Sequence, residues 1–90
     1  MTITIQIGNS DDKLTQIEWS NYVSEIQDML VDSGTKIHFF GGSTTWSPWQ
    51  NVAWVIDTNE AQEIAAAVGQ IRKKYNQDSV AWTEGSTLFI

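Results

Sequence analysis

The chain has 90 residues, a net charge of −6, a hydrophobic fraction of 41% and no cysteine. This length fits one domain spanning residues 1–90, and the apolar content suffices for a folded core. The absence of cysteine excludes disulfides and thiolate metal sites, and the acidic charge disfavours direct binding to the backbone of nucleic acid.

The first third of the chain predicts a strand followed by a well-capped helix. Isoleucine alternates with polar residues over 2–7, which is typical of a half-buried strand. Thr15 and Glu18 have the spacing of a capping box, and Gly34 is expected to end the helix. Between them, apolar residues recur every three or four positions and predict one buried stripe: Trp19, Tyr22, Val23, Ile26, Met29 and Leu30.

The middle of the chain predicts two strands joined by a long loop. The first of these strands covers 36–41, with Ile37 and Phe39 on one face and His38 and Phe40 on the other. The loop that follows begins with two glycines and carries two tryptophans on either side of a proline.

The last third predicts a strand, a helix and a hairpin. Residues 51–57 form the strand, and the polar residues 57–59 supply N-cap chemistry for the helix. A fourth strand over 80–83 is expected to turn at 84–85 into a short final strand over 86–90. The helix between them has this apolar stripe: Ala61, Ile64, Ala65, Val68, Ile71 and Tyr75.

This succession predicts an α+β fold with the order β-α-β-β-α-β, which is the ferredoxin-like split β-α-β motif with a C-terminal hairpin strand. Two helices would pack on one face of an antiparallel sheet. The other, open face is expected to be too apolar for water, so a second copy of the chain or a ligand should cover it. The residues expected on that face are Gln6, His38, Phe40, Val55 and Phe89.

Several segments resemble a family of small bacterial proteins of unknown function. They are Leu14-Thr15-x-x-Glu18-Trp19, a glycine at the end of that helix, and Tyr75-Asn76-Gln77-Asp78-Ser79-Val80. The resemblance spans most of the chain, but it rests on capping and packing residues. It implies the ferredoxin-like fold and no activity.

The loop over 41–50 is the strongest candidate for a binding site. Its glycines allow close approach of the backbone, its hydroxyl groups can donate and accept hydrogen bonds, and its indoles offer flat stacking surfaces. The alternative is that the two tryptophans fold back as a small core over a sheet edge. The loop residues assigned to ligand binding are Ser43, Thr44, Thr45, Trp46 and Trp49.

Three residues outside the loop complete the predicted ligand site. His38 and Phe40 would reach a ligand from the open sheet face, although a lone histidine is also common as a structural residue. Arg72 could bind an anion, or it could complement the negative end of the helix dipole. No catalytic motif, metal site or cofactor motif is found, so an enzyme is not expected.

Two functions remain open from the sequence. The first is a non-catalytic protein, expected to be encoded by a phage or mobile element, that sequesters a small planar ligand such as a nucleotide. The second is an acidic module that inhibits a basic or nucleic-acid-binding protein, with Glu25, Asp28 and Asp32 as an anionic stripe.

The sequence also bounds location and partners. The N-terminus lacks the basic and apolar stretches of a signal peptide, and no run approaches the length of a membrane span. We therefore expect a cytoplasmic protein that binds a small molecule or a protein and forms a homo-oligomer through the open sheet face, without contacting nucleic acid or membrane.

Overall fold

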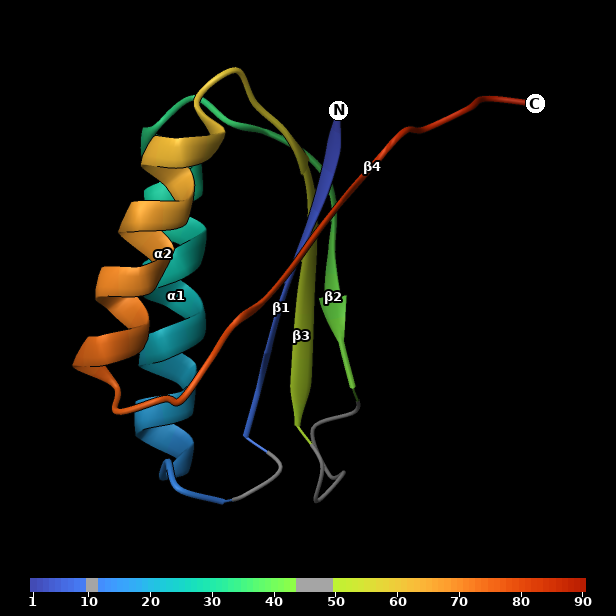
Figure 1. Ribbon diagram of the computed structural model, residues 1–90. Coiled ribbons are helices and arrows are strands. Elements are labelled where there is room, and N and C mark those ends of the chain that lie inside the picture. The colour runs from blue at the N-terminus through green and yellow to red at the C-terminus, as the bar shows by residue number, and fades with distance from the viewer. Residues whose placement is uncertain (10–11, 44–49) are drawn as a thin grey trace.

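The computed structural model describes residues 1–9, 12–43 and 50–90, and its elements follow the predicted order (Figure 1). They are β1 Thr2–Gly8, α1 Gln16–Asp32, β2 Lys36–Gly42, β3 Asn51–Asp57, α2 Ala61–Lys74 and β4 Ala81–Gly85. The β-α-β-β-α-β succession confirms the predicted α+β class. In these ranges, neither helix is long and apolar enough to cross a bilayer.

The strands form one four-stranded antiparallel sheet in the order β2-β3-β1-β4. β1 is central, and its Ile5 stands opposite Trp54 of β3 and Trp82 of β4. Both helices cover the same face of the sheet (Figure 1). α1 lies over β3, and the two are joined by a hydrogen bond that Trp54 Nε1 donates to Gln27 Oε1 of α1 at 2.7 Å. This order and layering are those of the ferredoxin-like fold.

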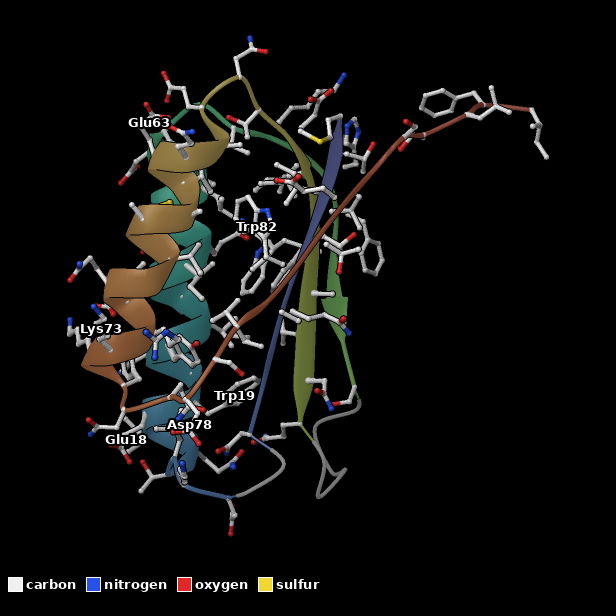
Figure 2. The ribbon with its side chains drawn as sticks, viewed as in Figure 1. Glu18, Trp19, Glu63, Lys73, Asp78 and Trp82 are labelled. Atoms are coloured by element: carbon white, nitrogen blue, oxygen red, sulfur yellow. The ribbon has the colours of Figure 1, made fainter. Side chains whose placement is uncertain are left out.

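The core fills the space between the helices and the sheet. The ring of Tyr22 stacks on that of Tyr75 with centroids 5.0 Å apart, which joins the two helices. Figure 2 shows Trp82 directed from β4 toward the helices, whereas Glu63 and Lys73 lie on the outer side of α2. The buried apolar side chains are Ile3, Ile5, Ile7, Leu14, Trp19, Tyr22, Ile26, Leu30, Trp54, Ile56, Ile64 and Val68.

Both ends of α1 follow the sequence-based prediction. Thr15 Oγ1 accepts from the Glu18 N–H at 3.2 Å, and Glu18 Oε1 accepts from the Thr15 N–H at 3.0 Å, which confirms the capping box. Gly34 has a φ of 73°. Its N–H and that of Thr35 donate to carbonyls of the last turn at 3.1 and 3.2 Å. These two bonds form a Schellman motif, which a residue with positive φ permits.

The predicted cap at the start of α2 is wrong. The N-cap residue is Glu60, and its side chain makes no capping hydrogen bond. Asp57 is still paired in β3, and the Thr58 hydroxyl accepts from the Glu60 N–H at 3.0 Å. The polar residues 57–59 therefore end β3 and form the turn before α2, which begins at Ala61.

A β-bulge in β2 changes which side chains face the helices. The register with β3 shifts between Ile37 and Phe39, with His38 between them. Because an extra residue reverses the alternation, Phe39 takes the open face and Phe40 the helical side. The Phe40 ring lies 5.3 Å from the Trp54 ring. The prediction that placed Phe40 on the open face is therefore wrong.

The predicted C-terminal hairpin is also wrong. Glu84 and Gly85 do not turn, because they stand opposite Ile3 and Thr2 and extend β4 along β1. Residues 86–90 form no strand and continue past the end of the sheet, away from both helices (Figure 1).

Candidate binding site on the open sheet face

The open face of the sheet is more polar than the sequence pattern predicted. β1 contributes Thr2, Thr4 and Gln6, which alternate with its buried isoleucines. β3 adds the half-buried Val55, and the bulge in β2 adds Phe39, which is 54% exposed. The face is therefore a mixed surface, and its use in forming homo-oligomers stays a prediction.

At one end of this face, the C-terminal segment and the sheet enclose a pocket of about 500 Å³. This volume is in the range of small-molecule sites, which is roughly 300–1,000 Å³. The pocket is formed by three strands and by the segment that follows β4. Its lining residues are Met1, Thr2, Lys36, His38, Val55, Asp57, Ser86, Thr87 and Phe89.

The side chains around the pocket offer three kinds of contact. Lys36 is a cation and a donor, and the Asp57 carboxylate is an acceptor. Phe89 is 88% exposed and offers an aromatic face at the rim. The hydroxyls of Thr2 and Thr87 are hydrogen-bonded to each other, which ties the C-terminal segment to β1. The pocket therefore offers a ligand a cation, a hydrogen-bond acceptor and an aromatic face.

Lys36 stands out because most other cations of this acidic protein are engaged elsewhere. The chain has five Lys and Arg residues. Lys13 pairs with Asp78 at 3.2 Å. Arg72 Nη1 donates to the Gln77 carbonyl at 2.7 Å. Lys36 has no ion pair with any described residue, so its ammonium group is free to meet a ligand in the pocket.

Lys74 is also engaged, at the seam between the helices. It bonds to Glu25, and this contact raises the pKa of Lys74 and lowers the pKa of the Glu25 carboxyl. The predicted anionic stripe of Glu25, Asp28 and Asp32 therefore includes a bound cation, which weakens it as a surface for a basic partner.

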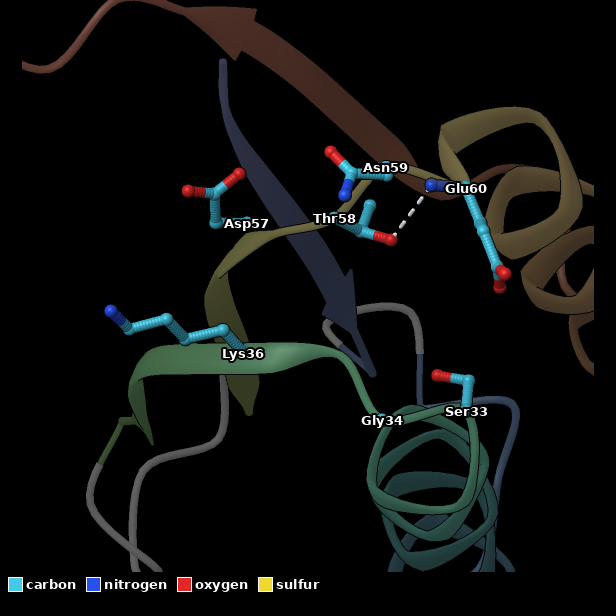
Figure 3. Close-up of a pocket in the computed structure, with 7 residues that line it drawn as sticks. All are labelled: Ser33, Gly34, Lys36, Asp57, Thr58, Asn59 and Glu60. Atoms are coloured by element: carbon cyan, nitrogen blue, oxygen red, sulfur yellow. Dashed lines mark hydrogen bonds between the residues drawn. The ribbon is translucent and has the colours of Figure 1, made fainter.

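A second pocket of about 360 Å³ adjoins the first, at the end of the sheet where β2 begins and β3 ends. The two pockets share Lys36 and Asp57, which Figure 3 shows projecting to the same side from neighbouring strands. Turn residues form the rest of the second pocket, including the Glu60 carboxylate. With two carboxylates beside one lysine, this second pocket is less suited to an anion than the first.

Of the eight residues predicted to bind a ligand, the four that the structure describes do not come together. Thr44, Thr45, Trp46 and Trp49 lie outside the described residues, so the tryptophan loop stays a prediction. Ser43, at the start of that loop, accepts the Asn51 N–H on its hydroxyl at 2.9 Å and extends the pairing of β2 with β3.

The other three predicted residues lie in separate places. His38 lines the pocket on the open face. Phe40 contacts Trp54 on the helical side of the sheet, and Arg72 closes the turn after α2. A small ligand that contacts His38 could therefore not contact Phe40 and Arg72 as well.

Sequence reasoning did not include Lys36, Asp57 or Thr2 among the site residues. The signal was present in the strand alternation. Lys36 and His38 are two residues apart on β2, and Val55 and Asp57 are two apart on β3. Within the described residues, no group of three or more His, Cys, Asp or Glu could hold a metal ion.

These features define a small ferredoxin-like α+β domain with a pocket on its open sheet face. No family model and no curated protein matches the chain. Its structure is similar to the solution structure of the C-terminal domain of the MgtC protein from Mycobacterium tuberculosis. The TM-score is 0.67 at 6% identity, covering 93% of this chain and 86% of that chain. The similarity shows a shared fold only, so the sequence resemblance to a family of unknown function stays a prediction.

Proposed function

We propose that this protein is a non-catalytic binding domain that holds a small planar anion, of the nucleotide class, between its open sheet face and its C-terminal segment. The observation that carries this proposal is the convergence of Lys36, His38, Asp57 and Phe89 on one pocket. An ammonium group binds phosphate, a carboxylate accepts a ring N–H, and a phenyl ring stacks on a base.

Sequestration is the biological role that this site would serve. A small protein of a phage or mobile element that removes a nucleotide signal needs tight binding and no turnover. Lys36 should supply much of the affinity, because hydrogen bonds to charged groups contribute about 1.5–3 kcal/mol. Its removal should therefore weaken binding about 10- to 100-fold.

The test is a panel of nucleoside mono- and diphosphates and cyclic nucleotides, measured by thermal shift and then by calorimetry. A bound member raises the melting temperature by mass action. Lys36→Ala should lose at least tenfold in affinity. Lys73→Ala is the matched control, because Lys73 lies on the outer side of α2, away from the pocket (Figure 2). Equal losses in the two variants would mean non-specific attraction and would reject the pocket.

A further variant separates the pocket from the tryptophan loop. If the pocket holds the ligand, Trp46→Ala binds it as the unchanged protein does. Loss of binding in Trp46→Ala with full binding in Lys36→Ala would assign the ligand to the loop instead. Mass spectrometry of the recovered ligand tests the non-catalytic role, and a converted ligand would contradict it. The proposal is wrong if no member of the panel binds.

A further inference from the structure

β4 and the segment after it form a continuous unpaired edge. β4 is an outer strand, because β1 pairs with it on one side and no described strand lies on the other. The pairing with β1 ends at Thr2 opposite Gly85. Beyond that point the chain continues in the same direction, away from the helices (Figure 1). The backbone over 81–90 therefore presents N–H and C=O groups that another strand could bond.

The composition of this edge favours pairing. The segment after β4 has the sequence Ser-Thr-Leu-Phe-Ile, in which β-branched and aromatic residues are frequent. Leu88 is 83% exposed, Phe89 is 88% exposed and Ile90 is fully exposed. Natural edges are usually blunted by lysine, proline or a bulge, and residues 81–90 contain neither lysine nor proline.

We infer that the occupant of this edge is a second copy of the chain, paired antiparallel to β4 about a two-fold axis at Gly85. The result is a continuous eight-stranded sheet across the dimer. In this register Leu88 of one copy lies opposite Trp82 of the other, and Phe89 lies opposite Ala81. This inference goes beyond the proposed function and does not depend on it.

Strand alternation and charge restrict the possible registers, and the axis at Gly85 satisfies both. Opposed residues in an antiparallel pair share a face, so only registers that oppose residues of the same parity are allowed. A shift that placed the axis at Glu84 would set two carboxylates against each other. With the axis at Gly85, Glu84 lies opposite Ser86. Its carboxylate already accepts a hydrogen bond from Trp82 Nε1 at 3.0 Å within its own copy.

The area is sufficient for a specific dimer. A buried phenylalanine removes roughly 200 Å² from water, and a leucine or isoleucine about 100 Å² each. Both tails, with the surfaces they cover on the partner copy, would bury roughly 1,500 Å². Specific interfaces bury about 1,200–2,000 Å² in total.

In the dimer Phe89 packs against the partner copy, while Lys36, His38 and Asp57 of the proposed pocket stay accessible. Alternation puts Thr87 and Phe89 on the open-face side, where both line the pocket, and puts Leu88 on the other side. Dimerisation is measured without ligand, and ligand binding is measured by calorimetry. Either proposal can therefore be rejected while the other holds.

A cysteine at the two-fold axis tests the register. Opposed Cα atoms in antiparallel strands are about 4.5–5.5 Å apart, within the range that a disulfide spans. The chain has no cysteine of its own. A Cβ at Gly85 meets no atom within 4 Å, and the same is true at Gly69 on α2, which provides a matched control. Gly85→Cys should give a disulfide-linked dimer under mild oxidation, and Gly69→Cys should stay monomeric.

A charge at the interface tests its energetics. Leu88→Lys changes an exposed side chain, so the fold should be unaffected, but the dimer dissociation constant should rise at least tenfold in sedimentation. Ile17→Lys, at a site on α1 that is 75% exposed, is the control and should leave it unchanged. The inference is overturned if the protein is monomeric at millimolar concentration. It is also overturned if Phe39→Lys dissociates the dimer and Leu88→Lys does not, which would place the interface on the open face.

Discussion

Asn9 and Gln50 are joined by two hydrogen bonds, one from backbone to backbone and one between side chains. The Asn9 N–H donates to the Gln50 carbonyl at 2.8 Å, and Asn9 Nδ2 donates to Gln50 Oε1 at 3.2 Å. The Asn9 side chain, which is buried, also bonds to both the N–H and the carbonyl of Leu14 at 3.1 Å. One amide thus connects the turn after β1 to the residue before β3.

We expect Asn9→Ala to lower the free energy of unfolding by about 2–3 kcal/mol, because the buried Leu14 N–H and carbonyl lose their partner. Urea denaturation measures this change. Asn21→Ala, at an exposed position of α1, is the control and should change stability by less than about 0.5 kcal/mol. Similar midpoints for the two variants would show that the Asn9 bonds are replaced by water at no cost.

The capping box gives α1 an acid-sensitive start. The Thr15 backbone N–H, and then its hydroxyl contact, hold the pKa of Glu18 below its ordinary value of 4.5. A lowered folded-state pKa stabilises the fold above the unfolded value, and this contribution is lost as pH falls through the folded value.

Glu18→Gln should therefore lower the melting temperature at pH 7 and flatten its decline below about pH 4.5. Glu63→Gln, in the first turn of α2, removes the same charge without a capping box. Melting curves from pH 7 to pH 2 make the comparison. Parallel acid limbs for Glu18→Gln and the unchanged protein would contradict the assignment.

Tyr22 contributes its ring to the core rather than its hydroxyl. Burial raises the pKa of Tyr22 to about 12, partly offset by Arg72, and the hydroxyl has no hydrogen-bond partner among the described residues. Tyr22→Phe should therefore keep or slightly raise stability at pH 7. Tyr22→Ala should lose about 3–5 kcal/mol, because it leaves a cavity beside Tyr75.

Tyr22→Phe should also change how stability depends on pH in the alkaline range. Between pH 10 and 12 the unfolded chain ionises at Tyr22 while the folded protein keeps the proton, so stability falls as pH rises. Tyr22→Phe should remove this part of the decline, measured by urea denaturation at pH 9 to 11.5. An unchanged slope would show that Tyr22 ionises in the folded state as readily as in the unfolded one.

Two glycines with open surroundings should respond to alanine in opposite directions. A Cβ at either Gly34 or Gly69 meets no atom within 4 Å, so packing does not distinguish them. Gly34 has a φ of 73°, and alanine there should cost about 1 kcal/mol. Gly69 is inside α2, where alanine should stabilise by about 0.5–1 kcal/mol. Thermal melts of the two variants check the signs, and a shared sign would contradict the backbone argument.

The sequence by itself determined the fold class, the positions of both helices and the ends of α1. The capping box joins Thr15 to Glu18, and the apolar stripes repeat every three or four residues. These signals depend on residues within a few positions of one another, so local propensity and alternation are enough to predict them. His38 was placed correctly on the open face for the same reason.

The tertiary structure decided the rest, because the deciding contacts join residues far apart in the chain. The bulge at His38 arises from the register of β2 against β3, and it moves Phe40 to the Trp54 ring. Glu84 and Gly85 extend a strand because β1 supplies partners for them. The candidate pocket likewise needs both chain ends and two other strands to meet, and no local pattern encodes that meeting.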